Sequence, residues 1–302
     1  MIIGGVQLFL GGSSVKAIFG YGAKLSPSAN LSMTNLVSDD GVVASDTTGV
    51  GTTRARLAAA GYGAGNAIFG YGLASPSHLS LTNLVSNTGV VASDTTGVGT
   101  ARSSLAAAGY GTDKAIFGYG YTGSYISLTN LVSNTGVVAT DTTGVGTARY
   151  GLAAARYGTD KAIFGYGVSS GGTNVSLTNL VSNTGVVATN TTGVGTARND
   201  LAAAGYGTDK AIFAYGYTSS SVSLINLVSN TGVVATDTTG SGTIRNGLAA
   251  AGYGADKAIF GYGNNASAVY SMTNLVSNTG DVAYDSTSVG TDRFGLAAAS
   301  YS

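Results

Sequence analysis

Short stretches of apolar and small residues recur along the chain, and Gly, Asn and Asp separate them. In the copy that begins at Arg149, the turns Gly-Thr-Asp (158–160) and Asn-Thr-Gly (183–185) fall between such stretches. Turn residues of this kind join neighbouring antiparallel strands. The pattern therefore predicts four short strands in this copy, over 152–157, 161–166, 175–182 and 186–192.

The same pattern of strands and turns occurs six times, so the chain consists of six internal repeats. The motif Lys-Ala-Ile-Phe-Gly-Tyr-Gly at 114–120 recurs, with at most one residue changed, at segments that begin at Lys16, Asn66, Lys161, Lys210 and Lys257. One Arg per copy recurs at spacings of 48, 47, 49, 47 and 48 residues. This period is typical of propeller blades. The predicted repeats are 16–65, 66–113, 114–160, 161–209, 210–256 and 257–302.

These features predict an all-β protein, a six-bladed β-propeller of four-stranded antiparallel blades over 16–302. The Ala-Ala-Ala runs fit the innermost strands, because neighbouring blades crowd at the axis. Ile163 and Phe164 are expected to fill the space between adjacent sheets. The last copy of the Ala-rich strand, near 296–301, is expected to pair with 16–21 and close the ring, which removes exposed strand edges. A β-solenoid is the alternative architecture.

Residues 1–15 lie outside the repeats and form a separate N-terminal segment. The segment is apolar, but it lacks a basic n-region and is too short to span a membrane. It therefore predicts neither a secretion signal nor membrane insertion. We expect it to serve as an anchor or an extra outer strand, or to cover the axis.

The composition argues against nucleic-acid binding, catalysis and metal binding. Fourteen Lys and Arg balance fourteen acidic residues, so a basic footprint for nucleic acid is missing. The chain has one His and no Cys, and all its acidic residues are Asp, so histidine triads, thiolate sites and His clusters for metals are excluded. Asp39 and Asp40 form the only adjacent acid pair and fall in a turn. We therefore predict a non-catalytic protein without a cofactor or a bound metal.

The repeated Arg is expected to be structural, because six guanidinium groups at equivalent positions need partners on one face. The Arg residues are Arg54, Arg102, Arg149, Arg198, Arg245 and Arg293. The expected partners are backbone carbonyls or the repeated acidic position, which holds Asp46, Asp94, Asp141, Asp237 and Asp285. A close pair near a protein surface gains roughly 4 kcal/mol. The fourth copy has Asn190 instead, so Arg198 is expected to have the weaker partner.

Differences between the copies concentrate in the loop between the second and third strands, and this loop should emerge on the same face as the repeated Arg. The loops cover 23–30, 73–79, 121–126, 168–175, 217–222 and 264–269. We expect this face to contact a partner, because variable loops carry many binding sites and tyrosines suit both glycans and proteins. The candidate contact residues are Lys24, His78, Tyr121, Tyr125, Tyr217, Asn264 and Asn265, with His78 in an exposed loop.

The Arg at 149, the small-residue strand after it and the motif at 162–167 resemble the kelch repeat over residues 16–302. Two features depart from kelch: a Tyr lies between the glycines, and the chain has no Trp. The repeated sequence motifs are also similar to repeats in tail-fibre and other virion proteins of tailed phages. That resemblance implies a virion structural or receptor-binding protein, made in the host cytoplasm, whose partners are other virion proteins, host-surface glycans or proteins, or further copies of itself. A carbohydrate- or protein-binding propeller that is not attached to a virion is the alternative.

Overall fold

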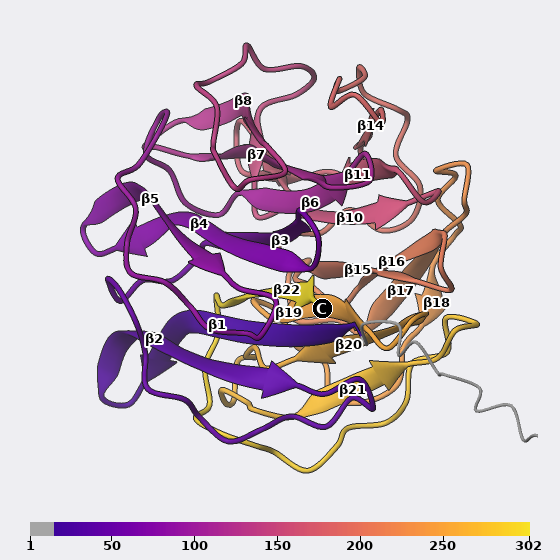
Figure 1. Cartoon of the computed structure of the whole chain (residues 1–302). Coiled ribbons are helices and arrows are strands. Elements are labelled where there is room, and N and C mark those ends of the chain that lie inside the picture. Colours follow the sequence, from indigo (N-terminus) through magenta and orange to yellow (C-terminus); the bar gives the residue numbers. More distant parts are fainter. Residues whose placement is uncertain (1–14) are drawn as a thin grey trace, which may run out of the picture.

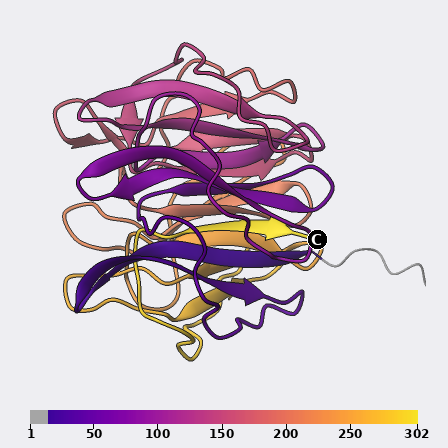
Figure 2. The same cartoon turned by 60° about the vertical axis from the view of Figure 1, so that its left-hand side comes forward.

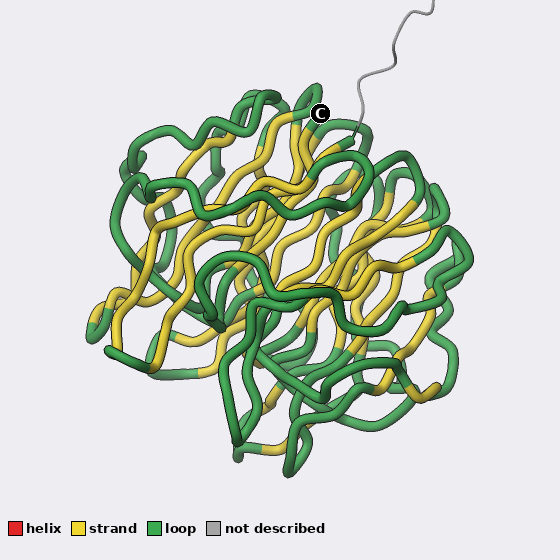
Figure 3. The backbone as a smooth tube through the Cα atoms, turned by 90° about the horizontal axis from the view of Figure 1, so that it is seen from below, coloured by secondary structure: helices red, strands yellow, loops and turns green. Residues whose placement is uncertain are grey.

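The computed structural model describes residues 15–302, and every regular element in this range is a β-strand. Figure 3 shows the strands in yellow and the loops in green, with no helix among the described residues. The predicted all-β class is therefore correct. Except for Val15, the predicted N-terminal segment, including its roles as anchor or outer strand, lies outside the described residues.

Six antiparallel sheets repeat one strand order, in which an Ala-rich strand pairs with the Ala-Ile-Phe strand, and this strand pairs with a third that ends in Asn-Leu-Val. The first three sheets are β22 (Ala297–Tyr301), β1 (Lys16–Leu25) and β2 (Ser28–Val37); β3 (Ala58–Tyr62), β4 (Asn66–Ala74) and β5 (Ser77–Val85); and β6 (Ala106–Tyr110), β7 (Lys114–Tyr121) and β8 (Tyr125–Val132). The other three are β10 (Ala153–Tyr157), β11 (Lys161–Gly165) and β14 (Thr178–Val181); β15 (Ala202–Tyr206), β16 (Lys210–Ala214), β17 (Leu224–Val228) and β18 (Thr238–Thr239); and β19 (Ala249–Tyr253), β20 (Lys257–Gly261) and β21 (Thr273–Val276).

The predicted fourth strand is present as a strand in one sheet only, as the two-residue β18. Elsewhere the segment runs beside the third strand through isolated bridges, such as Val181–Val187 and Thr178–Thr191. It is nevertheless held by backbone hydrogen bonds, one of which joins the Ala188 N–H to the Leu180 carbonyl at 2.8 Å. A seventh, small sheet consists of β9 (Arg149–Tyr150), β12 (Val168–Ser169) and β13 (Thr173–Asn174).

The first and last described strands pair with each other. β22 lies antiparallel to β1, with Lys16 opposite Tyr301 and Gly20 opposite Ala297. The indigo β1 and the yellow β22 lie side by side in both views (Figures 1 and 2). The predicted pairing of the C-terminal strand with 16–21 is therefore confirmed, and the start and end of the repeat share one sheet.

The core lies between consecutive sheets, and the Ala-Ile-Phe strand supplies it in both directions. Phe164 packs with Ile116 and Tyr119 of the preceding sheet, whereas Ile163 packs with Phe213 of the next. Ile163 and Phe164 are both fully buried. Successive side chains of a strand point to opposite faces, so a single strand can serve two interfaces. Each buried Ile or Phe contributes about 1.5–3 kcal/mol.

The Ala-rich strands of all six sheets line one cavity of about 310 Å³. Each of these strands contacts the Ala-rich strands of the sheets before and after it, and β22 contacts both β19 and β3. Small side chains permit this close approach of six backbones. Arg156 is the exception, because it also lines the cavity, at a position that holds Gly61 in one copy and Ser300 in another.

Six backbone hydrogen bonds form a closed cycle just before the Ala-rich strands begin. The N–H groups of Arg56, Ser104, Gly151, Asp200, Gly247 and Gly295 donate, in that order, to the carbonyls of Gly295, Arg56, Ser104, Gly151, Asp200 and Gly247 over 2.6–2.9 Å. All six residues have positive φ angles, from 48° to 62°. Each sheet is thereby joined at the same level to the sheet before it and the sheet after it.

The Tyr of each Gly-Tyr-Gly motif has the left-handed backbone conformation, with φ angles of 63–66°. In β1, β4 and β7 the strand register shifts across this residue, as in a β-bulge. The Tyr ring is fully buried in every copy. In the second sheet, for example, the Tyr71 hydroxyl donates to the Val98 carbonyl at 3.1 Å. The bulge therefore places the aromatic ring of this Tyr in the interior of the protein.

The Gly before this Tyr provides room for the Phe of the next sheet. A Cβ atom on Gly118 would lie 2.7 Å from Cζ of Phe164. One copy has Ala214 at this position, and there the Tyr215 and Phe260 ring centres are 5.5 Å apart. The equivalent distances in the other copies are 5.1–5.2 Å. A methyl group is therefore accommodated by a small displacement of the facing ring.

We expect Gly118→Ala to destabilise the protein by about 1 kcal/mol, because the added methyl overpacks the contact with Phe164. Gly118→Val should cost at least about 3 kcal/mol, because the ring cannot move far enough. Urea unfolding would measure both changes. Ala214→Gly is the matched control and should change the unfolding free energy by less than about 1 kcal/mol. A Gly118→Ala protein that is more stable than the parent would contradict this account.

Candidate functional site

The variable loops lie beside the segments that carry the repeated Arg. The first residue of each loop pairs with the residue that follows an Arg: Ala23–Phe294, Leu73–Ala55, Tyr121–Ser103, Val168–Tyr150, Tyr217–Asn199 and Asn264–Asn246. The loops and the Arg segments therefore lie on one face, as predicted. The candidate residues on this face separate into two groups, and Lys24, which pairs with Ala29 in the first hairpin, belongs to neither.

Three candidate residues meet in an aromatic cluster. The Tyr121 ring centre is 6.0 Å from that of His78 and 5.8 Å from that of Tyr125. Tyr150, which sequence reasoning missed, completes the cluster at 5.4 Å from both tyrosines. The expectation that His78 lies in an exposed loop is wrong, because it is half-buried in β5 and pairs there with Leu73.

The other three candidates, Tyr217, Asn264 and Asn265, line a pocket of about 580 Å³ between the loops of two consecutive sheets. Asn199 and Asn246, the residues after the two Arg side chains of these sheets, also line it. None of the residues that line the pocket is Lys, Arg or His. We call this space the polar pocket. It can accept hydrogen bonds through amide oxygens, and it lacks the positive charge that an anion requires.

Each repeated Arg is completely buried and links two sheets. The Arg102 guanidinium lies 4.1 Å from the ring centre of Tyr71, which belongs to the preceding sheet. Its Nε donates to the Tyr119 carbonyl at 2.9 Å, and its terminal nitrogens donate to Asn130 Oδ1 at 2.7 Å and to the Thr100 carbonyl at 3.1 Å. The ring stacking and the fork of donors together hold adjacent sheets in one arrangement.

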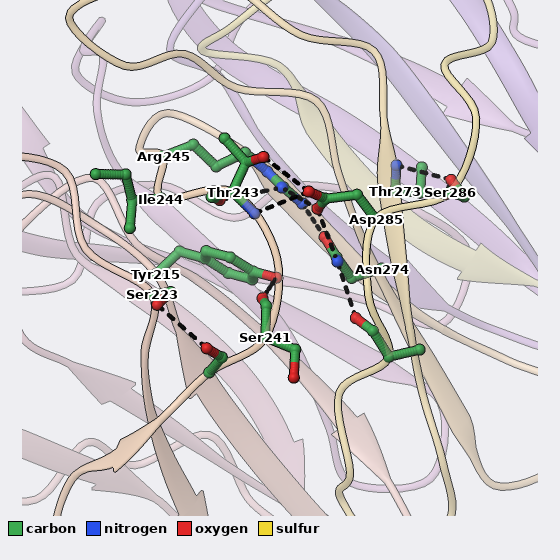
Figure 4. Close-up of polar contacts among 12 residues, drawn as sticks. Tyr215, Ser223, Ser241, Thr243, Ile244, Arg245, Thr273, Asn274, Asp285 and Ser286 are labelled. Atoms are coloured by element: carbon green, nitrogen blue, oxygen red, sulfur yellow. Dashed lines mark hydrogen bonds and ion pairs between the residues drawn. The ribbon is translucent and has the colours of Figure 1, made fainter.

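The predicted ion pairs with Asp are present for five of the six Arg side chains. Arg54, Arg102 and Arg198 lie 3.8 Å from their Asp partners. The guanidinium of Arg245 is turned further toward its carboxylate, with 3.2 Å to Asp285. Figure 4 shows this copy, with Arg245, Asp285 and Asn274 in contact. Within residues 15–302, Nε of Arg245 has no hydrogen-bond partner, which agrees with this rotation.

The pairing of Asn190 differs from the prediction. Arg198 pairs with Asp237, and Asn190 instead occupies the acidic position that belongs to Arg149. Each Arg pairs with the Asp that follows the third strand of its own sheet, not with the Asp that comes shortly before it in the sequence. The Asn190 amide accepts a hydrogen bond from the Thr147 N–H at 3.1 Å and donates to the Thr147 hydroxyl at 2.8 Å. Within residues 15–302, the Arg149 side chain therefore has no carboxylate partner.

In the other five copies, the Asp also fixes the crossover that enters its sheet. The Thr100 hydroxyl donates to Asp141 at 2.6 Å and the Thr100 N–H donates at 3.0 Å. Partial burial acts to raise the pKa of Asp141, but the hydrogen bonds from Thr100 and Asn130 and the charge of Arg102 outweigh it and hold the pKa below 3.8. The same balance lowers the pKa of Asp46, Asp94, Asp237 and Asp285.

The pKa of each buried tyrosine is shifted in the opposite direction, upward. Burial raises the pKa of Tyr166, Tyr215 and Tyr262 to about 12, although the guanidinium over each ring acts to lower it. These phenols therefore remain neutral in the folded protein and act as hydrogen-bond donors and stacking partners rather than as nucleophiles.

Residues 15–302 contain no group of three or more His or Asp side chains that could hold a metal ion. No helix in the same range is long and apolar enough to cross a membrane. Compared with models of known protein families and with curated proteins, the chain matches none of them. The function is therefore inferred from the geometry of the loop face and from the repeats.

We expect Asn190→Asp to stabilise the protein by about 0.5–1 kcal/mol at pH 7, because it gives Arg149 a carboxylate partner. A carboxyl with a lowered pKa stabilises the fold above its unfolded value, 3.8 for the equivalent Asp141, and loses this effect as the pH falls through the folded value. The gain should therefore diminish as the pH falls below 3.8. Thermal melts in a series of buffers from acid to neutral pH would measure it, with Asp141→Asn as the reverse substitution. A gain that does not change with pH would exclude the carboxylate as its cause.

We expect alkaline unfolding to be coupled to the buried tyrosines. Phenols with a pKa near 12 in the fold and 10.0 when exposed stabilise it fully below pH 10, and this contribution is lost as the pH rises toward 12. Absorbance at about 295 nm should show part of the 18 Tyr ionising near pH 10, with the rest ionising only as circular dichroism records unfolding. Tyr166→Phe should remove one of the late-ionising groups. Ionisation of every Tyr near pH 10 in a folded chain would contradict the prediction.

Proposed function

We propose that the six repeated sheets are the blades of a six-bladed, kelch-like β-propeller whose ring is closed by β22. The pairing of β22 with β1, the cyclic order of contacts between the Ala-rich strands and the cycle of six backbone hydrogen bonds support this architecture. In each sheet, the segment with isolated bridges serves as the outer fourth strand.

In this proposal the propeller is a non-catalytic virion protein of a tailed phage, with a structural or receptor-binding role. The observation that carries the proposal is the concentration of variation on one face: most interior residues are nearly identical in six copies, whereas the loops on the Arg face differ in length and chemistry. A constant scaffold with variable loops suits the recognition of a changing surface. The resemblance of the repeats to those of phage tail fibres indicates that this surface would be that of the phage's host cell.

The proposed partners are other virion proteins and a glycan or protein of the host surface, and copies of the chain are proposed to associate with one another. A carbohydrate- or protein-binding propeller that is not attached to a virion is the second candidate. The polar pocket and the half-buried aromatic cluster of Tyr121 favour it equally, because both features suit a binding surface and neither requires a particle.

Quantitative mass spectrometry of virus particles, purified from the sample that yields the sequence, tests the virion assignment. We expect the protein at a fixed, stoichiometric copy number per particle, which would also distinguish a tail from a vertex or shell position. Ribosomal and host outer-surface proteins in the same preparation serve as controls for contamination. Absence from particles that contain the other virion proteins would reject the assignment and leave the free binding propeller.

A further inference from the structure

A small pocket lies at the cycle of six backbone hydrogen bonds. All six residues of the cycle line it, and the Leu that follows each of them completes the lining. The residues of the cycle are Arg56, Ser104, Gly151, Asp200, Gly247 and Gly295. The volume is about 90 Å³, and we call this space the cycle pocket. Because each sheet contributes to the lining, side chains of different sheets can contact a single ligand there.

Three of the six positions carry a side chain at a cost to the backbone. The φ angle is positive in every copy, which favours glycine, and three copies have glycine. Arg56, Ser104 and Asp200 adopt the same conformation, with φ angles of 55°, 52° and 48°. L-residues other than glycine are disfavoured there. The glycine copies show that the fold needs no side chain at this position, so the strain at three polar residues points to a function.

Arg56 and Asp200 lie on opposite sides of the cycle pocket, because they are three steps apart in a closed cycle of six. Asp200 Oδ1 is 3.0 Å from the place that a Cβ atom on Gly151 would occupy, and Cγ of Arg56 is 3.5 Å from that of Gly295. Each charged side chain thus uses the space beside a glycine. Both residues are exposed, and neither forms an ion pair within residues 15–302.

The carboxylate of Asp200 lacks the donors that the repeated Asp residues have. Hydrogen bonds from Thr100 and Asn130 help to hold the pKa of Asp141 low. The pKa of Asp200 is raised instead, because protein atoms displace water from its carboxylate although part of the residue is exposed, and the charge of Arg56 offsets this effect only in part. A cationic donor in the cycle pocket would supply what this carboxylate lacks.

The two opposite charges determine which ligand fits. A guanidinium binds a carboxylate through charge-assisted hydrogen bonds, and a carboxylate accepts such bonds from an ammonium group. An anion without a positive group would be repelled by Asp200, and a cation without a negative group would be repelled by Arg56. A ligand that carries both charges avoids both repulsions. The pocket is well below the size that holds drug-sized molecules, so this ligand has few non-hydrogen atoms.

We propose that the cycle pocket binds a small zwitterion, a free α-amino acid with a short apolar side chain, whose carboxylate pairs with Arg56 and whose ammonium group pairs with Asp200. Ser104, which is bonded to Arg56 in the cycle through its N–H at 2.8 Å, offers a hydroxyl to the same ligand. The lining leucines offer an apolar surface to the side chain of the amino acid. The inference goes beyond the proposed function and does not depend on the virion assignment, because residues of the cycle define the site.

Isothermal titration calorimetry and saturation-transfer NMR on the full chain test the site, with glycine and L-alanine as the zwitterions. Glycinamide is the matched probe that keeps only the positive charge, and N-acetylglycine is the one that keeps only the negative charge. We expect saturable binding of glycine or L-alanine. Binding of both single-charge probes should be weaker by about tenfold or more, because each probe loses one charge-assisted pair.

Arg56→Gly and Asp200→Gly should each weaken zwitterion binding by about tenfold or more, because each removes one of the two charges. Both variants have the glycine of other copies at a φ angle that suits glycine, so their melting temperatures should be unchanged or raised. Arg156→Gly removes a charge from the cavity of the Ala-rich strands and is the matched control. It should leave the affinity for the zwitterion unchanged.

A charge swap gives a further check. The double variant Arg56→Asp with Asp200→Arg keeps both charges at the pocket and should bind the zwitterion in the reversed orientation, whereas either substitution alone should abolish binding. No binding of either amino acid, equal binding of a single-charge probe, or undiminished binding by both glycine variants would each overturn the inference. Lowered melting temperatures of both glycine variants without amino-acid binding would also overturn it, because they would identify Arg56 and Asp200 as a structural pair.

Discussion

The structure depends on a buried guanidinium group that stacks on a tyrosine of the preceding sheet. Taking such a charge out of water costs several kcal/mol unless partners replace the lost hydration. In every copy an asparagine oxygen accepts from the guanidinium, and in five copies a carboxylate lies beside it. In four copies a tyrosine carbonyl also accepts from Nε, whereas Arg245 and Arg293 are turned toward their carboxylates and their Nε has no partner within residues 15–302. The stacking of the guanidinium on the tyrosine ring, at 4.1–4.6 Å, is present in all six copies and links each pair of consecutive sheets.

The tyrosine under this guanidinium has a backbone conformation that disfavours L-residues by roughly 1–2 kcal/mol. Three contacts hold it there: the stacked Arg, the hydrogen bond from its hydroxyl to the crossover, and the edge of the next phenylalanine. The glycines on both sides of the tyrosine let neighbouring groups approach. The bulge, the stacked Arg and the crossover are thus a single structural unit, and the tyrosine is the residue that joins them.

The repeat period, the all-β class and the first three strands could be predicted because all six copies have the same order of apolar, small and turn residues. The fourth strand was overestimated, since its apolar spacing is that of a strand although it forms only isolated bridges outside β18. The partner of Asn190 was misassigned because Arg198 is closer to it in the sequence. Arg149, beside which Asn190 lies, comes three strands earlier in the chain. Tyr150 was missed, but comparing the residue after each Arg across copies would have identified it.

The division between constant interior and variable loops follows from how many copies each residue touches. An interior Phe packs on the Gly and Tyr of the preceding sheet, so a change in one copy affects the packing of its neighbour. Ala214 illustrates this coupling, because a single methyl group displaces the ring of Phe260 in the adjacent sheet. A loop residue pairs chiefly with the Arg segment of its own sheet, and its side chain can change alone. The loop face can therefore vary without disturbing the contacts that position the sheets.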